Sequence, residues 1–249
     1  MTEPAAEALY HDPALAQFYD LANRWDSDFD RCMALAADAS SVLDLGCGTG
    51  ELTVALAPGR TVFGVDPAAA MLAIARQRPG GDRATWVEAD ARAVRLGRTF
   101  DLVVLTGHTF QVFLTEDDQR AVLATIAAHL GPGGRFIFDS RNPAAGRRPD
   151  RRREETMRRF DHPELGPIEA WNESAYDTAT GVLAYTNGYR VLNTGAEHAA
   201  SARIRYTPQA DLARLIAEAG LTVDAWYGDW KESPFLPDSS DIVPLGRLA

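Results

Sequence analysis

Short apolar runs alternate with amphipathic segments along the first 140 residues of the chain. Five of these runs have the length and the side-chain types of strands. They are SVLDLG (41–46), TVFGVD (61–66), ATWVEAD (84–90), FDLVVLTG (100–107) and RFIFDS (135–140). The segments between them have apolar residues at helical spacing, and EDDQRAVLATIAAHL (116–130) opens with three acids, which favour the first turn of a helix. Strands that alternate with helices are typical of a parallel, doubly wound α/β sheet with helices on both faces.

Beyond about residue 145 the pattern changes to long alternating segments. Residues 169–193, with a turn at TATG, and residues 199–206 predict an antiparallel sheet, a β lid inserted into the parallel domain. A helix over 207–220 follows, with Thr207 as its expected N-cap and Gly220 as its expected stop.

The two ends of the chain complete this architecture. Residues 14–25 and 28–39 predict helices before the first strand, and 221–230 and 239–248 predict the final strands. We therefore predict a Rossmann-like, mostly parallel sheet of seven strands. The expected division is 1–145 for the N-terminal helices and cofactor-binding core, 146–206 for the lid, and 207–249 for the helix and strands that complete the core.

Composition narrows the classes of partner. The 249 residues carry a net charge of −10, and the one basic cluster, at 147–159, is interleaved with acids, so we interpret it as a solvated connection and expect no nucleic-acid partner. Cys32 and Cys47 form no disulfide or metal-ligand pattern. The first residues have neither the basic nor the apolar region of a secretory signal, and no apolar run is long enough to span a bilayer. We expect a soluble, cytoplasmic protein without a metal site or a membrane partner.

The loop after the first strand raises the question of a ligand, because it has glycines at three alternate positions, Gly46, Gly48 and Gly50. Ligands of open α/β sheets bind beyond the carboxyl ends of the strands, where such glycines allow close approach to backbone amides. Asp66 ends the second strand, twenty residues after Gly46, at a position from which a carboxylate can bind both ribose hydroxyls. The pattern therefore indicates a ligand that contains a nucleoside.

Two acids, Glu51 and Asp44, indicate which nucleoside-containing ligand the loop binds, a dinucleotide or S-adenosylmethionine. The spacing is G-x-G-x-G, and Glu51 stands where a dinucleotide fingerprint has its third glycine. Asp44, just before the loop, would repel a pyrophosphate but attract a cation. S-adenosylmethionine, an adenosine with a sulfonium, an ammonium and a carboxylate, fits both features. A tight turn without a ligand and the dinucleotide site of an oxidoreductase are the alternatives.

The motifs VLDLGCGTG, VFGVDPAAAML and EADAR, in this order and spacing, resemble the first motifs of the class I S-adenosylmethionine-dependent methyltransferases over residues 40–140. The resemblance implies that Asp66 holds the ribose, that Asp90 meets the adenine amino group and that Ala91 supplies a backbone donor. It also implies a tyrosine and an arginine that reach the carboxylate of the cofactor, which are Tyr19 and Arg24 here. The full set of expected cofactor contacts is Tyr19, Arg24, Asp44, Gly46, Cys47, Gly48, Gly50, Asp66, Pro67, Met71, Asp90, Ala91 and Leu105. For Tyr19, Arg24 and Met71, ordinary packing or a surface position is the alternative, and for Pro67 it is a plain proline at the start of a helix.

Four further motifs resemble the glycine N-methyltransferase-like branch of this family. They are LTGHTFQVF (105–113), FIFDSRNP (136–143), IRYTP (204–208) and GDWKE (228–232). The resemblance implies that Arg141 binds the carboxylate of the substrate and that Tyr206 lies near the methyl group. An arginine paired with Asp139 or Asp101 is the alternative for Arg141.

His108 departs from that branch, which has an asparagine that holds the substrate amine at this position. An imidazole can accept a hydrogen bond from an amine or alcohol, or act as a base near its ordinary pKa of ~6.5. The alternative for His108 is a loop histidine without a role in the reaction. We add Tyr189, on a predicted lid strand, to the candidates. Trp25 is expected in the core, and Trp230 in packing.

The sequence thus predicts transfer of a methyl group from S-adenosylmethionine to a small-molecule acceptor, an amine, by in-line displacement, with S-adenosylhomocysteine as the product. The catalytic candidates are His108, Arg141, Tyr189 and Tyr206. One alternative is an O-methyltransferase that uses His108 as the base, and another is a cofactor-binding module without catalysis. We expect a monomer or a homodimer.

Overall fold

The computed structural model describes residues 8–145 and 150–249, which divide into two compact units. The larger unit contains residues 25–145 and 206–249, and the smaller one contains residues 8–24 and 150–205. The helices before Arg24 thus group with the antiparallel sheet, a grouping that the hydrophobic pattern does not reveal. Each unit has its own sheet and its own core.

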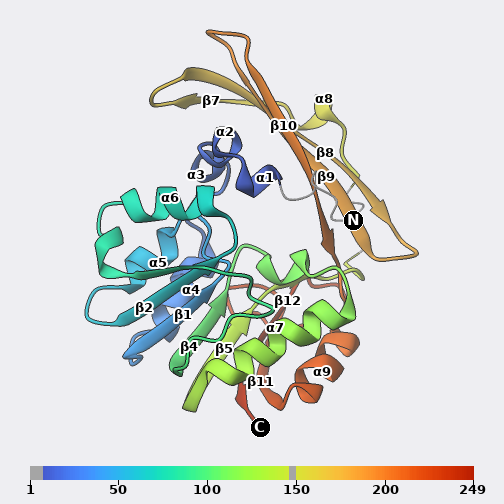
Figure 1. Ribbon diagram of the computed structural model, residues 1–249. Coiled ribbons are helices and arrows are strands. Elements are labelled where there is room, and N and C mark those ends of the chain that lie inside the picture. Colours follow the sequence, from blue (N-terminus) through green and yellow to red (C-terminus); the bar gives the residue numbers. More distant parts are fainter. Residues whose placement is uncertain (1–7, 146–149) are drawn as a thin grey trace. The chain divides into compact units, whose positions relative to one another are not determined.

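A mostly parallel sheet organises the larger unit (Figure 1), in the order β11-β12-β5-β4-β1-β2-β3. The strands are β1 (Ser41–Leu45), β2 (Thr61–Asp66), β3 (Thr85–Glu88), β4 (Phe100–Leu105), β5 (Leu130–Phe138), β11 (Leu221–Tyr227) and β12 (Asp241–Leu248). The strands from β5 to β3 are parallel, whereas β12 runs antiparallel to both β5 and β11. A two-residue strand, β6 (Ser140–Arg141), also pairs with β12. The predicted α/β class and the mostly parallel sheet are confirmed.

Helices cover both faces of this sheet. One core joins it to α7 (Glu116–His129) and α9 (Gln209–Glu218), and another joins it to α4 (Ser27–Leu35) and α5 (Glu51–Leu56). Alternate side chains of β4 enter the two cores, which explains why the strand is apolar without interruption from Leu102 to Leu105. The helix α6 (Ala69–Gln77) and the 3₁₀ helices η1 (Gly81–Arg83) and η2 (Thr109–Val112) lie in the connections.

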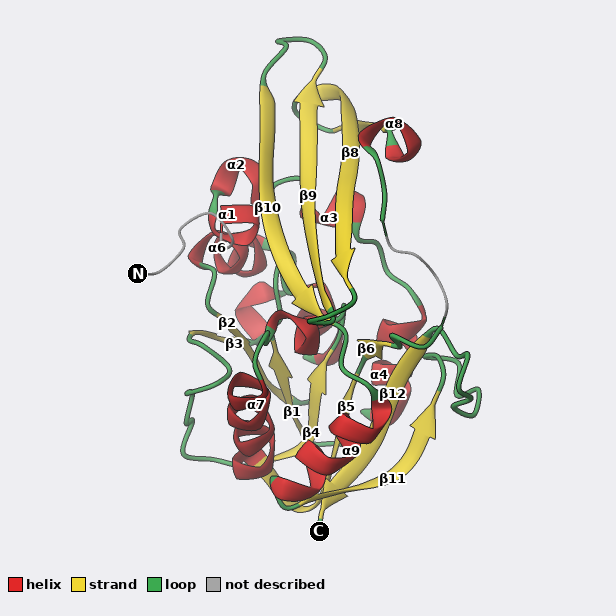
Figure 2. Ribbon diagram, turned by 90° about the vertical axis from the view of Figure 1, so that its right-hand side faces the viewer, coloured by secondary structure: helices red, strands yellow, loops and turns green. Residues whose placement is uncertain are grey.

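A four-stranded antiparallel sheet, ordered β10-β9-β8-β7, organises the smaller unit (Figure 2). Its strands are β7 (Arg158–His162), β8 (Gly166–Asp177), β9 (Val182–Val191) and β10 (Glu197–Arg205). The unit also contains the short helices α1 (Ala8–His11), α2 (Pro13–Ala16), α3 (Tyr19–Ala22) and α8 (Arg153–Thr156). Phe18 is fully buried and stacks on Tyr189, with 4.5 Å between ring centroids. The predicted inserted antiparallel sheet and its turn at TATG are confirmed.

Several predicted details are wrong, each for a local reason. The helix expected over 14–25 is broken, because the chain turns at Phe18 to bury that ring, and Trp25 lies outside any helix with 41% of its surface exposed. Pro208, not Thr207, precedes α9, since the Thr207 hydroxyl accepts a hydrogen bond from Gln119 Nε2 on α7 at 2.8 Å.

The basic segment at 147–159 is not a plain connection. Residues 147–149 lie outside the described ranges, but the rest contains α8 and the start of β7. Arg153 lies over the ring of Trp171 at 3.6 Å from its centroid, and Arg159 pairs with Glu169 on β8 at 2.7 Å. Gly220 does end α9, with φ 74°, and Trp230 packs beside a core as expected. In the described part of the chain, no helix has the length and apolar character needed to cross a membrane.

Candidate active site

The glycine loop connects β1 to α5 and is tied to the end of β2. The amides of Gly46 and Cys47 both donate to the carbonyl of Val65, at 2.7 and 3.1 Å. A Cβ on Gly46, whose φ is 77°, would lie 2.3 Å from Thr109 Cγ2, and one on Gly50 would lie 2.4 Å from Trp86 Cη2. At these two positions the close approach that the sequence indicates is made by side chains of the protein itself.

Asp66 fixes the shape of the loop. It is the last residue of β2 and is 8% exposed. One carboxylate oxygen accepts from the amide of Gly48 at 2.9 Å, and the other accepts from the amide of Ala68, ahead of α6, at 2.8 Å. The expected contact of Asp66 with the ribose diol of a ligand stays a prediction. Pro67, beside it, is exposed in the bend before α6.

Asp44 is a buried carboxylate with an unsatisfied oxygen. It lies on β1, is 2% exposed, and receives the hydroxyl of Thr53 on α5 at 2.6 Å through Oδ2. Its Oδ1 has no hydrogen-bond partner among the residues that the structure describes. Burial raises the pKa of Asp44 to about 7, against which the bond from Thr53 acts. A cation next to Oδ1 would compensate this buried charge, so the site fits a ligand with a sulfonium and an ammonium.

Asp90 has a different environment from the other two acids. The guanidinium of Arg92 grips both of its carboxylate oxygens and also donates to Asp118 on α7 at 2.7 Å. The bond from Arg92 lowers the pKa of Asp90, so this acid already has a cationic partner. The amide of Ala91 donates to no group within the described ranges and is free to meet a ligand. The adenine contacts of both residues stay predictions.

Three of the other expected cofactor contacts are partly or wholly in the interior. Met71 and Leu105 are 1% and 0% exposed, and Leu105 belongs to the core on the α7 side. Burial raises the pKa of the Cys47 thiol well above its ordinary value, which keeps it a neutral thiol. These positions are consistent with packing, which was the stated alternative for Met71.

His108 belongs to the region where we expect the methyl acceptor to bind. It has an unusual backbone conformation, and two carboxylates lie near its ring. Its φ is 62°, a left-handed conformation that is rare for residues other than glycine. Its amide donates to Asp139 Oδ1 at 3.0 Å, and its Nε2 lies 3.2 Å from Asp139 Oδ2 and 3.4 Å from Asp241 Oδ1. Asp139 is 1% exposed, while the imidazole is 28% exposed. The ring is therefore held at Nε2 and partly open to solvent.

Sequence reasoning missed most of the acids around this histidine. Asp241 was not considered, Asp139 appeared only as a partner for Arg141, and Asp28 was only part of a helix. Burial raises the pKa of Asp28, and the charge of Asp139 acts in the same direction, which places these two acids near each other. The pKa of Asp241 is lowered: burial acts to raise it, but the hydrogen bonds from His108 and Ser240 outweigh that effect. The sequence offers one signal for these three acids, because each lies at the end of a strand or in the first turn of a helix.

Arg141 is available for an anion. In the described part of the chain, no carboxylate comes within ion-pair distance of its guanidinium; Asp241, its backbone partner across β6 and β12, acts on it only at longer range. The two pairings considered from the sequence do not form, because Asp101 accepts from the amides of Ser40 and Ser41 and Asp139 is bound to His108. The carboxylate-binding role of Arg141 stays a prediction.

The four remaining candidates belong to different parts of the chain. Tyr206 is buried in the larger unit. In the smaller unit, Tyr189 stacks on Phe18, Tyr19 meets the edge of Tyr10 at 6.3 Å between centroids, and Arg24 is exposed. Roles next to the cofactor or the methyl group stay predictions for all four.

Comparison with known proteins agrees with this geometry. Residues 42–134 match the family model of the methyltransferase domain. The cypemycin N-terminal methyltransferase of a Streptomyces species is 37% identical over 108 residues, which are 43% of this chain and 44% of that protein. The chain therefore matches less than half of the length of this relative.

Two solved structures extend the likeness to the whole chain. The CcbJ methyltransferase from Streptomyces caelestis has a TM-score of 0.77 at 25% identity, covering 98% of this chain and 99% of that one. CalS10, an amino pentose methyltransferase from Micromonospora echinaspora solved with bound S-adenosylmethionine, has a TM-score of 0.68 at 25% identity, covering 96% and 98%.

The family match begins at β1 and includes the glycine loop, Asp66 and Asp90. The sheet order and the loop geometry agree with that match. Residues 42–134 thus match a methyltransferase domain, and the comparisons support the resemblance of VLDLGCGTG, VFGVDPAAAML and EADAR to the class I S-adenosylmethionine-dependent methyltransferases.

Proposed function

We propose that this protein transfers the methyl group of S-adenosylmethionine to the nitrogen of a small-molecule amine. The observation that carries the donor assignment is Asp44, a buried carboxylate whose Oδ1 lacks a partner in the described structure. A ligand with a ribose, a sulfonium and an ammonium suits a site in which this acid lies near the end of β1 and Asp66 lies at the end of β2. The bound donor supplies an electrophilic methyl group on a positively charged sulfur.

The residues near His108 support an amine as the acceptor. Three acids, Asp28, Asp139 and Asp241, lie close to this ring or to each other, and they would attract a protonated amine. Two of the similar proteins, the cypemycin enzyme and CalS10, are described as an N-terminal methyltransferase and an amino pentose methyltransferase. The glycine N-methyltransferase-like branch is a narrower hypothesis that rests on the short motifs at 105–113, 136–143, 204–208 and 228–232, and the role of Arg141 follows from it.

The chain's own groups would contribute by placing the reactants. Asp66 and the loop amides orient the donor, and Arg141 offers a planar fork to an anionic group of the acceptor. Holding the nucleophile in line with the carbon–sulfur bond supplies most of the rate, since such displacements depend chiefly on near-attack geometry. His108 accepts or orients the proton that the amine must lose before it attacks.

One observation favours a second candidate, O-methylation of a hydroxylated metabolite. A histidine whose ring lies beside carboxylates is an arrangement suited to a general base for a hydroxyl group, and the Nε2 of His108 hydrogen-bonds to Asp241 at 3.4 Å and lies 3.2 Å from the buried Asp139. An ammonium group becomes a strong nucleophile when it loses a proton of ordinary acidity. An alcohol is a weak nucleophile unless a base takes its much less acidic hydroxyl proton. It would therefore depend on His108 far more strongly.

The test is a screen of amines, amino acids, amino sugars and hydroxylated metabolites for release of S-adenosylhomocysteine by the purified chain. Mass spectrometry of the methylated product locates the new bond on nitrogen or oxygen. We expect N-methylation, and calorimetry should show that S-adenosylmethionine binds with one site per chain. Exclusive O-methylation would select the second candidate, and failure of the donor to bind would overturn both.

A further inference from the structure

We infer that His129, the last residue of α7, is a positioning residue for the donor. Its ring holds the segment 90–96, which carries Asp90 and Ala91, the two residues expected to contact adenine. This role rests on the proposed function for the identity of the donor, S-adenosylmethionine. The hydrogen bonds of His129 themselves do not depend on the reaction.

Residues 90–96 lie between β3 and β4, outside any helix or strand. The carbonyl of Asp90 accepts from the amides of Ala93 and Val94, both at 3.0 Å. This turn ties Asp90 to Val94, whose side chain is buried in the core on the α7 side. A group that holds the main chain just beyond Val94 therefore helps to place Asp90 as well.

Three residues of this segment donate to α7, and their acceptors recur at helical spacing along one face of that helix. The pairs are Arg92 with Asp118 at 2.7 Å, Arg95 with Thr125 Oγ1 at 2.7 Å, and the Leu96 amide with His129 Nε2 at 3.0 Å. The first two bonds are donated by arginine side chains, whereas the third is donated by the main chain. Its acceptor, His129, is 1% exposed, so the backbone of the segment is held away from water.

The partners of the imidazole fix its protonation. The amide of Leu96 can only donate, so Nε2 of His129 accepts and carries no proton. The carbonyl of Thr125, 2.7 Å from Nδ1, can only accept, so Nδ1 carries the proton and donates it. His129 is therefore a neutral Nδ1–H imidazole with both nitrogens bound to the main chain. Such a ring has no nitrogen left for a ligand, and its role is to hold the chain.

The bond from Leu96 keeps the segment in one arrangement before the donor arrives. A partly buried N–H without an acceptor is unfavourable, so loss of the bond would favour arrangements in which this amide reaches water. Donor affinity falls in proportion to the fraction of molecules whose site is correctly arranged. The methyl transfer uses no atom of His129, so loss of the bond should weaken donor binding and leave kcat unchanged.

Two variants of His129 separate its two hydrogen bonds. In His129→Gln, the side-chain oxygen can take the place of Nε2, so the acceptor for Leu96 is kept and the donor to Thr125 is lost. In His129→Asn, the side-chain nitrogen can take the place of Nδ1, so the donor to Thr125 is kept and the acceptor for Leu96 is lost. Ile126→Val, which trims a fully buried side chain of the same helix, is the control for lost stability alone.

Two measurements without ligand test the bond itself. The chain has five histidines, and the nitrogen-15 signals of His129 are those lost in His129→Gln. At a pH of about 8, above the ordinary histidine pKa, the wild type should show Nδ1–H. Hydrogen exchange at the Leu96 amide should be slow in the wild type and in His129→Gln, and roughly tenfold faster in His129→Asn. A wild-type ring protonated at Nε2, or equal exchange in the three proteins, would overturn the inference.

Calorimetry with S-adenosylmethionine tests the positioning role. We expect His129→Asn to lower the donor affinity about tenfold, the equivalent of one hydrogen bond. His129→Gln and Ile126→Val should stay within about twofold of the wild type, because both keep the acceptor for Leu96. In all three variants, kcat at saturating donor and the acceptor KM should also stay within about twofold.

The opposite outcomes are equally distinct. An unchanged donor affinity in His129→Asn, or a loss of the same size in His129→Gln or Ile126→Val, would overturn the inference, as would a loss of kcat in place of affinity. A wild type that binds no S-adenosylmethionine would refute the proposed function and the positioning role together. In that case the tautomer and the protection of the Leu96 amide would still be observed.

Discussion

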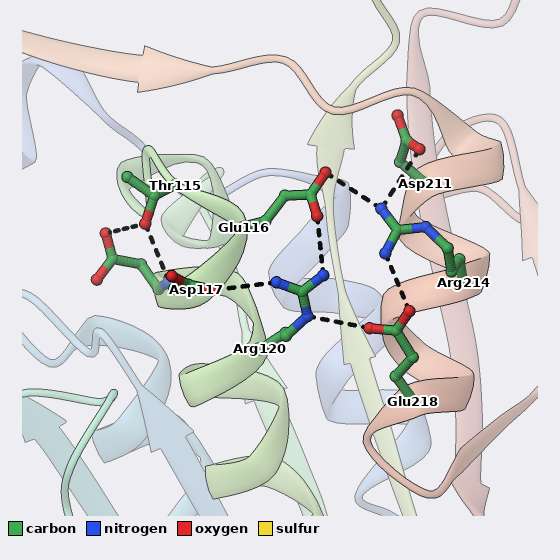
Figure 3. A network of polar contacts seen from close by, with 8 residues as sticks. Thr115, Glu116, Asp117, Arg120, Asp211, Arg214 and Glu218 are labelled. Atoms are coloured by element: carbon green, nitrogen blue, oxygen red, sulfur yellow. Dashed lines mark hydrogen bonds and ion pairs between the residues drawn. The ribbon is translucent and has the colours of Figure 1, made fainter.

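Two regions of the larger unit are rich in carboxylates and use them in opposite ways. At the carboxyl ends of β1, β2 and β5, Asp44, Asp66 and Asp139 are buried and bind backbone amides, a hydroxyl or a histidine. Between α7 and α9, by contrast, exposed acids and arginines neutralise one another (Figure 3). The members of that surface network are Glu116, Asp117, Arg120, Asp211, Arg214 and Glu218.

The acids of the surface network are neutralised by arginines, whereas the buried acids at the strand ends have, in the described part of the chain, no arginine or lysine that neutralises all of them. In the surface network, each arginine contacts at least three acids, and water screens all of them. At the strand ends, no arginine or lysine forms an ion pair with Asp44 or Asp139 within the described residues. Buried charge without a cation is costly, so its presence indicates a site that binds one.

The largest expected effect is from Asp66→Ala. The change removes two bonds to loop amides together with the acceptor for the ribose, and bonds to charged groups contribute ≈1.5–3 kcal/mol each. We expect the affinity for S-adenosylmethionine to fall at least about 100-fold by calorimetry. Asp82→Ala, which removes an exposed acid, is the control and should bind normally. Unchanged donor affinity in Asp66→Ala would contradict the site assignment.

Asp44→Asn tests whether the buried charge itself matters. The amide keeps the acceptor for Thr53 but cannot pair with a cation, so the donor affinity should fall roughly 50-fold near pH 8, within the range for one bond to a charged group. The affinity of the wild type should rise as the pH approaches 7, because Asp44, whose pKa is raised to about 7, must ionise to pair with the ligand. The affinity of the variant should lack this rise.

The raised pKa of Asp44 also predicts how stability depends on pH. Ionisation of Asp44 should increase donor affinity but decrease the free energy of unfolding. Because its native pKa lies above the ordinary value, the folded state binds the proton more tightly than the unfolded state. Asp44 therefore lowers the free energy of unfolding as the pH rises from about 4 to about 7, by on the order of 4 kcal/mol at most. Urea unfolding at several pH values should show Asp44→Asn gaining stability relative to the wild type over this window. Parallel curves would mean that Asp44 is ionised throughout.

Arg141→Ala should affect the acceptor and not the donor. Loss of a bidentate contact to an anionic group costs one or two charged hydrogen bonds, so the acceptor KM should rise about tenfold or more. Calorimetry with S-adenosylmethionine should give an unchanged affinity, and Arg141→Lys should recover only part of the KM. Equal losses for donor and acceptor would show that Arg141 maintains the structure of β6 and β12.

The sequence predicts the donor half of the site much better than the acceptor half. The glycine loop, Asp44 and Asp66 lie within 25 residues and follow strand ends, so local pattern and motif spacing place them. Asp28, His108, Asp139 and Asp241 come from four distant segments. Only the antiparallel pairing of β12 with β6 brings Asp241 beside the chain that follows Asp139. Hydrophobic periodicity contains no information about such a pairing.

The same distinction explains which parts of the fold were predicted. Buried strands and long alternating strands are visible in the hydrophobic periodicity, and the existence and type of both sheets were predicted correctly, apart from β7. The N-terminal helix was wrong because the burial of Phe18 against Tyr189 depends on a contact across 171 residues, which overrides local helix propensity. β7 was missed because its pairing with β8 stabilises a segment whose basic composition favours solvent.

The smallest expected effect is at the surface network, and it completes the contrast. Arg120 contacts Glu116, Asp117 and Glu218 at 2.9–3.0 Å, yet all of these groups are solvent-exposed. Arg120→Ala should therefore lower the melting temperature by no more than about 2 °C. The difference should vanish in roughly 1 M salt, where the screening length falls to about 3 Å. Arg247→Ala, which breaks the single pair with Asp224, is the control for an isolated contact.

Donor affinity is the sharper measurement for this variant. Arg120 lies on α7, and Asp118 on the same helix accepts a hydrogen bond from Arg92. Arg92 also binds Asp90, so α7 is connected to Asp90 through this arginine. If the network only joins α7 to α9, calorimetry with S-adenosylmethionine should give the same affinity for Arg120→Ala and the wild type. A loss of affinity comparable to that of Asp44→Asn would mean that the exposed charges help to place Asp90, and the two regions would then act as one.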